Sequence, residues 1–164
     1  MRYIYIGKIV NTHGIKGELR ILSDFKYKKK IFKHDTKIYI SNEKTEETIN
    51  TYRPHKQFDM ITLVGYNNIN EVLKYKGQKV YIKDTDIKLE ENEYLDEDII
   101  GLTVIYNNKE VGYIKKIEKY PHQDLIVVKC MQKEYLIPYI SDIIESISLQ
   151  EKKIIIKNIK GLIE

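Results

Sequence analysis

The chain has 164 residues, of which 42% are hydrophobic and 32% charged, and its net charge at pH 7 is +4. This composition is typical of a globular protein and argues against disorder. Every apolar run is shorter than the ~18 residues that a membrane span needs. The single Cys130 cannot form an internal disulfide, which fits a reducing compartment. We therefore expect a cytoplasmic protein that does not act at a membrane.

The first half of the chain alternates between apolar and polar residues, a pattern that predicts β-strands. Its opening stretch reads as a first strand, because it lacks the unbroken apolar core of a signal peptide. One helix is expected over 67–77, with Asn67 or Asn68 as its N-cap and Gly77 at its end. Six short strands favour a small closed barrel, since closure removes exposed strand edges. The predicted strands are 2–10, 17–23, 36–41, 47–56, 59–66 and 78–83.

An acidic segment separates this half from the next, because residues 84–98 hold eight acidic side chains and one lysine. We place the first domain at 1–84, an acidic linker at 85–95 and the second domain at 96–164. Beyond the linker, residues 141–148 read as one helical turn opened by Ser141. The remaining pattern predicts a second small β-barrel, with strands at 99–106, 111–120, 125–131, 134–140 and 152–157.

Charge is unevenly distributed between the two halves. Residues 1–83 carry 17 Lys and Arg against 8 Asp and Glu, a net of +9, whereas residues 84–164 carry 11 against 16, a net of −5. A basic half favours polyanions such as RNA, and an acidic half favours basic proteins. Ordinary solvated surfaces would give the same imbalance. The chain also has 14 tyrosines. Their abundance fits ordinary strand residues, which favour tyrosine, and it also fits a surface that stacks on nucleic-acid bases.

The stretch HGIKGE, residues 13–18, superficially resembles a phosphate-binding loop. It lacks the spacing of a Walker motif and of a dinucleotide-binding fingerprint. Because it lies between two predicted strands, Gly14 and Gly17 are expected to supply the positive φ of a tight turn. His13, Lys16 and Arg20 would then place positive charge at one end of the barrel, where they could contact an anion.

The sequence offers no recognisable catalytic or metal-binding pattern. Its histidines and its cysteine lack zinc-site spacing, and its serines lack a nucleophile elbow. Adjacent acids in polar runs are expected to be solvated. We therefore predict no catalytic residues, no metal and no cofactor. The histidines and the cysteine without zinc-site spacing are His13, His34, His55, His122 and Cys130.

Several segments together resemble the ribosome maturation factor RimM family. They include GKIVNTHGIKGELRI, YRPHKQFDMITLVGYNNINEVLKYKGQKVYI, EYLDEDIIGLTVI, VGYIKKI, DLIVVK, YLIPYI and KGLIE. They run from Gly7 to Ile163 in the order and spacing of the family. The resemblance implies a mostly β protein with a six-stranded translation-factor-like barrel followed by a PRC-type barrel.

The resemblance also implies a function without catalysis. Members of the family bind the pre-small ribosomal subunit and help its head to mature, and their protein partner is small-subunit ribosomal protein nineteen. The resemblance then implies a monomer that binds this protein and pre-rRNA. The first barrel would face rRNA through His13, Lys16, Arg20, Arg53 and Lys56, helped by the lysine run at 26–30.

The partner-binding segment departs from the family pattern of two tyrosines and a tryptophan. This chain retains Tyr94 but has Leu95 and Asp96 where aromatic residues are usual. Tyr94 and Leu95 are still expected to anchor the partner, together with Asp98. The acidic run is either a docking surface for a basic protein or a loose linker.

Two other classes of function stay open at this point. The chain could be an RNA-processing or RNA-modifying enzyme, or the RNA-targeting domain of one. It could also be an interaction module for an unrelated partner. Binding of both rRNA and a ribosomal protein, without turnover, separates the assembly factor from both.

Overall fold

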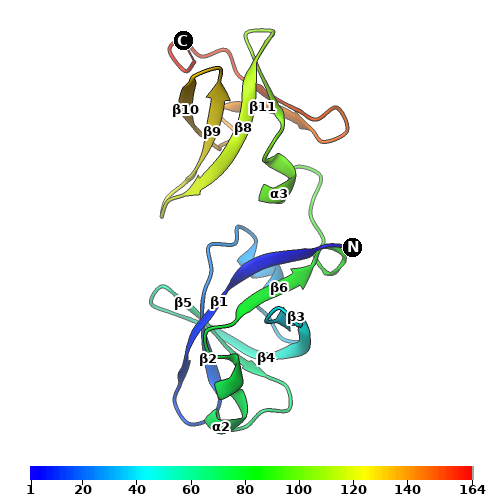
Figure 1. Ribbon diagram of the computed structural model, residues 1–164, viewed down its shortest axis with the longest axis vertical. Helices are drawn as coiled ribbons and strands as arrows, with labels where there is room; N and C mark the ends of the chain where they lie inside the picture. The colour runs from blue at the N-terminus through cyan, green and yellow to red at the C-terminus, as the bar shows by residue number, and fades with distance from the viewer. Residues whose placement is uncertain (164) are drawn as a thin grey trace. The chain divides into compact units, whose positions relative to one another are not determined.

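The computed structural model describes residues 1–163, which divide into two compact units, one spanning Met1–Lys88 and one that begins at Leu89. Each unit is built mainly from strands, as Figure 1 shows. The first contains β1 (Tyr3–His13), β2 (Glu18–Leu22), α1 (Lys28–Ile31), β3 (Lys37–Ile40), β4 (Thr45–His55), β5 (Phe58–Leu63), α2 (Ile69–Val72), the 3-10 helix η1 (Leu73–Tyr75), β6 (Lys79–Lys83) and the 3-10 helix η2 (Asp84–Asp86).

The six strands of the first unit form a closed barrel in the order β1-β2-β5-β4-β3-β6. The closed six-stranded barrel predicted from the alternation is therefore confirmed. Alternate residues point inward, so that Ile4 and Ile6 of β1 and Ile82 of β6 are almost fully buried. Burial of such a side chain contributes about 1.5–3 kcal/mol. The intervening residues face outward and are free to form binding surfaces.

The predicted helix over 67–77 is shorter than expected. α2 spans one turn and continues as η1, ending before Gly77. Asn68 begins it with a capping box: its side chain accepts a hydrogen bond from the Glu71 N–H, and the Glu71 carboxylate accepts one from the Asn68 N–H at 3.2 Å. The one-turn helix α1, within the lysine run, was not predicted, because four residues are too few to show helical periodicity.

The second unit is a single six-stranded sheet in the order β10-β9-β8-β7-β12-β11, in which β7 and β12 run parallel. Its fully buried core includes Ile114, Ile126 and Ile154. The prediction of a second small β unit is confirmed, but the sequence analysis expected five strands, and β11 is the sixth. Its elements are α3 (Asp96–Ile99), β7 (Thr103–Tyr106), β8 (Lys109–Lys119), β9 (Asp124–Cys130), β10 (Lys133–Pro138), β11 (Ile144–Ser148) and β12 (Lys153–Ile156).

The prediction of one helical turn over 141–148 is wrong for most of that segment. The N–H groups of Ile143 and Ile144 both donate to the Ile140 carbonyl, which makes a single turn. From Ile144 the chain extends as β11 and pairs with β12. The reason is packing, because Ile144 and Ile147 lie against the core of the sheet. α3, at the edge of the predicted linker, was also missed.

Candidate nucleic-acid and protein-binding surfaces

The HGIKGE stretch makes the turn between β1 and β2. Gly14 has φ = 70° and Gly17 has φ = 94°, both in the region that favours glycine. The turn is held against the start of α2, since the Ile69 N–H donates to the Ile15 carbonyl at 3.0 Å. A Cβ on Gly17 would lie 3.1 Å from the Asn68 carbonyl oxygen, whereas one on Gly14 would meet nothing within 4 Å. The glycines therefore serve the turn and its packing.

Beside this turn, side chains from four strands form what we call the histidine–arginine cluster: His13, Arg20, His55 and Phe58. An Arg20 Nη2–H donates to His13 Nδ1 at 2.8 Å, and this nitrogen is the acceptor because a guanidinium has no acceptor atom. The rings of His13 and His55 lie 5.9 Å apart. The Arg20 guanidinium stacks 5.0 Å from the centre of the Phe58 ring. The cluster thus presents aromatic rings around a held guanidinium.

The charges around the cluster are partly balanced. Arg53 makes a bidentate ion pair with Glu18, with both N–O distances 2.8 Å. The hydrogen bond from Arg53 lowers the pKa of Glu18 below its usual value. Burial, followed by the positive charges of Arg53 and Lys56, lowers the pKa of His55. Because Arg53 is paired with Glu18, Arg20 and Lys56 supply the further positive charge beside the cluster.

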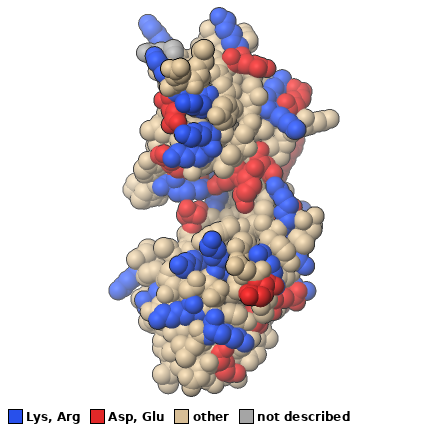
Figure 2. Space-filling view, viewed as in Figure 1, with Lys and Arg blue, Asp and Glu red and all other residues tan. Residues whose placement is uncertain are grey.

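Strand pairing brings most of the predicted RNA-facing residues to one outer face of the barrel. Asn11 of β1 pairs with Arg20 of β2, Arg20 pairs with Met60 of β5, and Met60 pairs with Arg53 of β4. Lys56 is exposed in the turn between β4 and β5, and Lys16 is exposed in the turn between β1 and β2. Figure 2 shows Lys and Arg side chains spread over the visible face of this unit, with fewer acidic ones.

The lysine run at 26–30 is partly occupied by structural contacts. The Lys28 ammonium lies 2.8 Å from the carboxylate of Asp59, which is only 4% exposed. The Tyr52 hydroxyl donates to the same carboxylate at 2.7 Å, and burial together with this bond raises the pKa of Tyr52 to about 12. Lys30 donates to the Lys88 carbonyl at 3.0 Å. These lysines therefore hold the barrel as well as adding charge.

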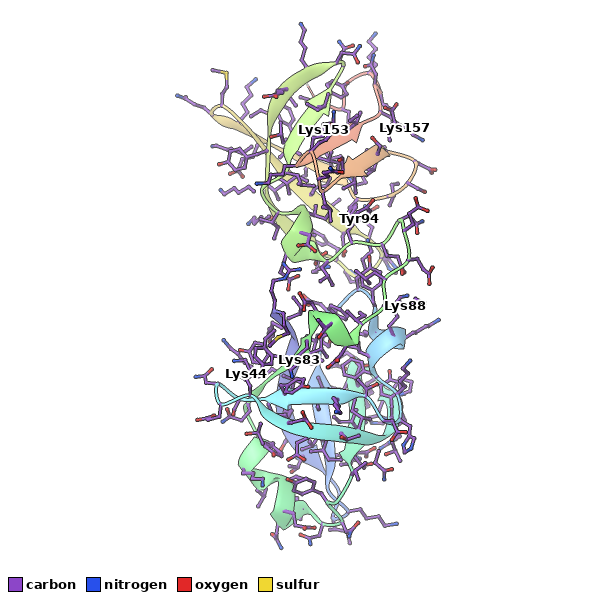
Figure 3. The ribbon with its side chains drawn as sticks, turned by 90° about the vertical axis from the view of Figure 1, so that its right-hand side faces the viewer. Lys44, Lys83, Lys88, Tyr94, Lys153 and Lys157 are labelled. Atoms are coloured by element: carbon purple, nitrogen blue, oxygen red, sulfur yellow. The ribbon has the colours of Figure 1, made fainter. Side chains whose placement is uncertain are left out.

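The predicted partner-binding residues lie at the start of the second unit. Tyr94, labelled in Figure 3, packs against the core of the sheet, and its hydroxyl lies 3.4 Å from the Ile147 carbonyl. Leu95 is only 4% exposed, and Asp98 is half-buried in α3. The expectation that Leu95 fills a pocket on a partner does not fit this burial. Tyr94 and Asp98 keep part of their surface exposed.

Asp96, which stands where the family usually has an aromatic residue, has a structural contact instead. The Lys119 ammonium lies 2.5 Å from its carboxylate and 3.0 Å from that of Asp124. This three-residue bridge ties α3 to β8 and β9. Part of the acidic segment is thus fixed to the second unit.

Sequence reasoning missed His55 and Phe58 as neighbours of Arg20. They lie at the ends of a β4–β5 hairpin whose register, His55 opposite Phe58, follows from its short turn. The pairing of β5 with β2, which brings them to Arg20, joins strands that are not consecutive and leaves no local signal.

Among residues 1–163, no helix is long and apolar enough to cross a membrane. The same residues contain no group of three or more His, Cys, Asp or Glu placed to hold a metal.

Comparison with known proteins identifies both units. The RimM N-terminal domain model matches residues 4–87, and the RimM PRC barrel model matches residues 96–162. The ribosome maturation factor RimM of Staphylococcus haemolyticus is 41% identical over 98% of this chain and 99% of its own length. The ribosome maturation factor RimM of Exiguobacterium sp. AT1b is 37% identical over 100% of this chain and 98% of its own length. The chain therefore belongs to the RimM family of ribosome maturation factors.

Proposed function

We propose that this chain is a non-catalytic assembly factor for the head of the small ribosomal subunit, acting as a cytoplasmic monomer. In this role the first barrel binds pre-rRNA and the second unit binds free ribosomal protein nineteen. The proposal is supported by relatives that are named ribosome maturation factors and match over the full length of the chain. The domains of the proposal are 1–84 and 96–164, joined by an acidic linker at 85–95.

The observation that carries the RNA-binding part is the outer face that includes the histidine–arginine cluster. Arg20 is held by His13 and Phe58 in a fixed orientation, which reduces the entropy lost when its remaining N–H groups bind a phosphate. Lys16 and Lys56 extend from the two turns beside it and supply mobile positive charge. Such a surface recognises a sugar-phosphate backbone and needs no bond chemistry.

The protein-binding part rests on the acidic segment and on Tyr94. Ribosomal proteins are basic, and an acidic surface would steer one toward the second unit. Tyr94 offers a half-buried aromatic ring whose orientation is fixed by its packing on the sheet, as in many interface anchors. Asp98 lies one turn further along the chain, in α3.

The protein-binding part is tested by calorimetric titration of the full chain with free ribosomal protein nineteen at two salt concentrations. We expect a Kd of about 1 micromolar or tighter, which corresponds to about 8 kcal/mol, and weaker binding at the higher salt. Tyr94→Ala should weaken binding, whereas Tyr113→Ala, which removes an exposed ring from β8, should not. No heat of binding at about 100 micromolar would overturn this partner.

The competing enzyme function is tested with the same preparation. Pre-rRNA incubated with the chain and analysed for cleavage and for modified nucleotides should be unchanged. Catalytic turnover that disappears with a point variant of the chain would contradict the assembly-factor proposal.

A further inference from the structure

A second outer face of the first barrel carries a row of tyrosines between lysines. Tyr5 of β1 pairs with Tyr81 of β6, and Tyr81 pairs with Tyr39 of β3, so the three side chains share one face. Tyr3 pairs with Lys83 on the same face. We call this surface the tyrosine–lysine face: Tyr3, Tyr5, Tyr39, Tyr81, Lys44 and Lys83.

The rings and ammonium groups of this face are in mutual contact. The rings of Tyr3 and Tyr39 lie 5.4 Å apart, edge to face, and those of Tyr5 and Tyr81 lie 6.0 Å apart. The Lys44 ammonium lies 4.1 Å from the centre of the Tyr81 ring and 5.4 Å from that of Tyr3. Lys83 lies 4.8 Å from the centre of the Tyr39 ring. Figure 3 labels both lysines, Lys44 in the turn between β3 and β4 and Lys83 at the end of β6.

Tyr39 is only 3% exposed and packs as part of the buried set, but the barrel interior does not require the rings of Tyr3, Tyr5 and Tyr81. That interior is filled by the alternate residues of the same strands, including Ile4, Ile82 and Ile40. Tyr3 and Tyr5 remain 39% and 44% exposed. Neighbouring exposed aromatics on the outer face of a small barrel are a surface suited to binding a ligand rather than to folding.

The charge of this face favours an anionic ligand. Lys8 and Lys79, which pair with each other, and Lys37, two residues before Tyr39, extend it with three more exposed lysines. The acidic side chains that act on it are fewer. The Tyr39 hydroxyl lies 3.5 Å from the Glu46 carboxylate. Asp86 is close enough for its negative charge to act on Tyr39 and Lys83, as is that of Asp24 on Tyr5 and that of Glu43 on Lys44. Five lysines against four acids leave a small excess of positive charge.

We propose that the tyrosine–lysine face binds a single-stranded segment of RNA, with unpaired bases stacked on Tyr3, Tyr5 and Tyr81. Lysines would contact the phosphates. A base that stacks on Tyr81 or Tyr3 would take the place of the Lys44 ammonium on that ring, and Lys44 would then contact a phosphate. Aromatic rings flanked by cations bind single strands because every base has a stacking face, whereas a duplex hides its bases. The inference deepens the proposed function and rests on it for the identity of the RNA as pre-rRNA.

The direct test uses a fluorescently labelled single-stranded RNA of ten uridines and the full chain at low salt. Tyr5→Ala should weaken binding by about 5- to 160-fold, the range that corresponds to the loss of one stacked base. Tyr5→Phe keeps the ring and should bind within about 2-fold of the unchanged chain. Tyr120→Ala, which removes an exposed ring from the second unit, is the matched control and should have no effect.

The charge component is tested separately. Lys44→Gln and Lys83→Gln should each weaken binding and reduce the slope of log K against log salt by about 0.7, as expected for one phosphate contact to a single strand. A ten-base-pair RNA duplex should lose little affinity on Tyr5→Ala. Amide NMR spectra of each variant confirm that the barrel is intact.

A second measurement distinguishes failure of this inference from failure of the proposed function. Immature small subunits are sedimented with the unchanged chain and with Tyr5→Ala. The inference is overturned when Tyr5→Ala binds the single strand as well as the unchanged chain does, whatever the particles show. The proposed function fails when the unchanged chain does not sediment with immature particles, even if the single strand requires Tyr5.

Discussion

Replacing each glycine of the β1–β2 turn by alanine separates backbone strain from packing. Both residues have positive φ, where an L-residue costs about 1–2 kcal/mol, and alanine recovers about 0.4–1 kcal/mol by restricting the unfolded chain. Gly14→Ala meets nothing within 4 Å. It should therefore lower the free energy of unfolding by about 1 kcal/mol.

Gly17→Ala carries the same strain and an additional clash. Its Cβ would lie 3.1 Å from the carbonyl oxygen of Asn68 and 3.4 Å from its carbonyl carbon, both backbone atoms at the N-cap of α2. Forcing a methyl group into a packed site costs typically 1–3 kcal/mol. The expected loss is therefore about 2–4 kcal/mol, at least about 1 kcal/mol more than for Gly14→Ala.

The assay is urea unfolding of the full chain followed through amide NMR signals. Signals from β1 and β2 report the first unit separately from the second, which matters because a two-domain chain need not unfold in one step. A sequence without tryptophan gives no simple fluorescence signal for this purpose. The reasoning is refuted if Gly17→Ala destabilises the first unit no more than Gly14→Ala does.

Three further changes test the local contacts. Asn68→Ala removes the capping box and should destabilise the first unit by about 1 kcal/mol in the same urea assay; an unchanged midpoint would contradict this. Lys119→Met leaves two aspartates without their shared cation and should cost the second unit about 1–3 kcal/mol, whereas the exposed control Lys116→Met should stay within about 0.5 kcal/mol. Because Arg53 lowers the pKa of Glu18 below 4.5, the stabilisation from Glu18 is complete above pH 4.5 and is lost as pH falls through its folded pKa. The difference in unfolding free energy between the unchanged chain and Glu18→Gln, measured from pH 7 downward, should thus shrink below pH 4.5. A difference that grows below pH 4.5 would contradict the prediction.

Strands with one buried face could be predicted from the sequence, because apolar and polar residues alternate along β1 and β6 and the apolar ones point inward. The cap of α2 was visible in part, since Asn67 or Asn68 was expected as its N-cap and the structure selects Asn68. The short helices were not, because α1 and α3 are each one turn long. The segment from Ile144 became β11 because it pairs with β12, a partner that no local pattern identifies.

The binding surfaces were less predictable than the fold for a physical reason. His13 and Arg20 belong to neighbouring strands of one hairpin, so the sequence could place them together. Phe58 reaches them only through the pairing of β2 with β5. Tyr5 and Tyr81 meet only because the first strand pairs with the last to close the barrel. Each of these neighbours is set by long-range topology.

The central claim is that this chain binds immature small ribosomal subunits without acting on them chemically. Its most direct test is sedimentation of the purified chain with small subunits from cells that lack their own copy of the factor, compared with mature subunits. The account predicts that the chain sediments with the immature particles, much less with the mature ones, and leaves their rRNA unchanged. Equal sedimentation with both, or with neither, would contradict it.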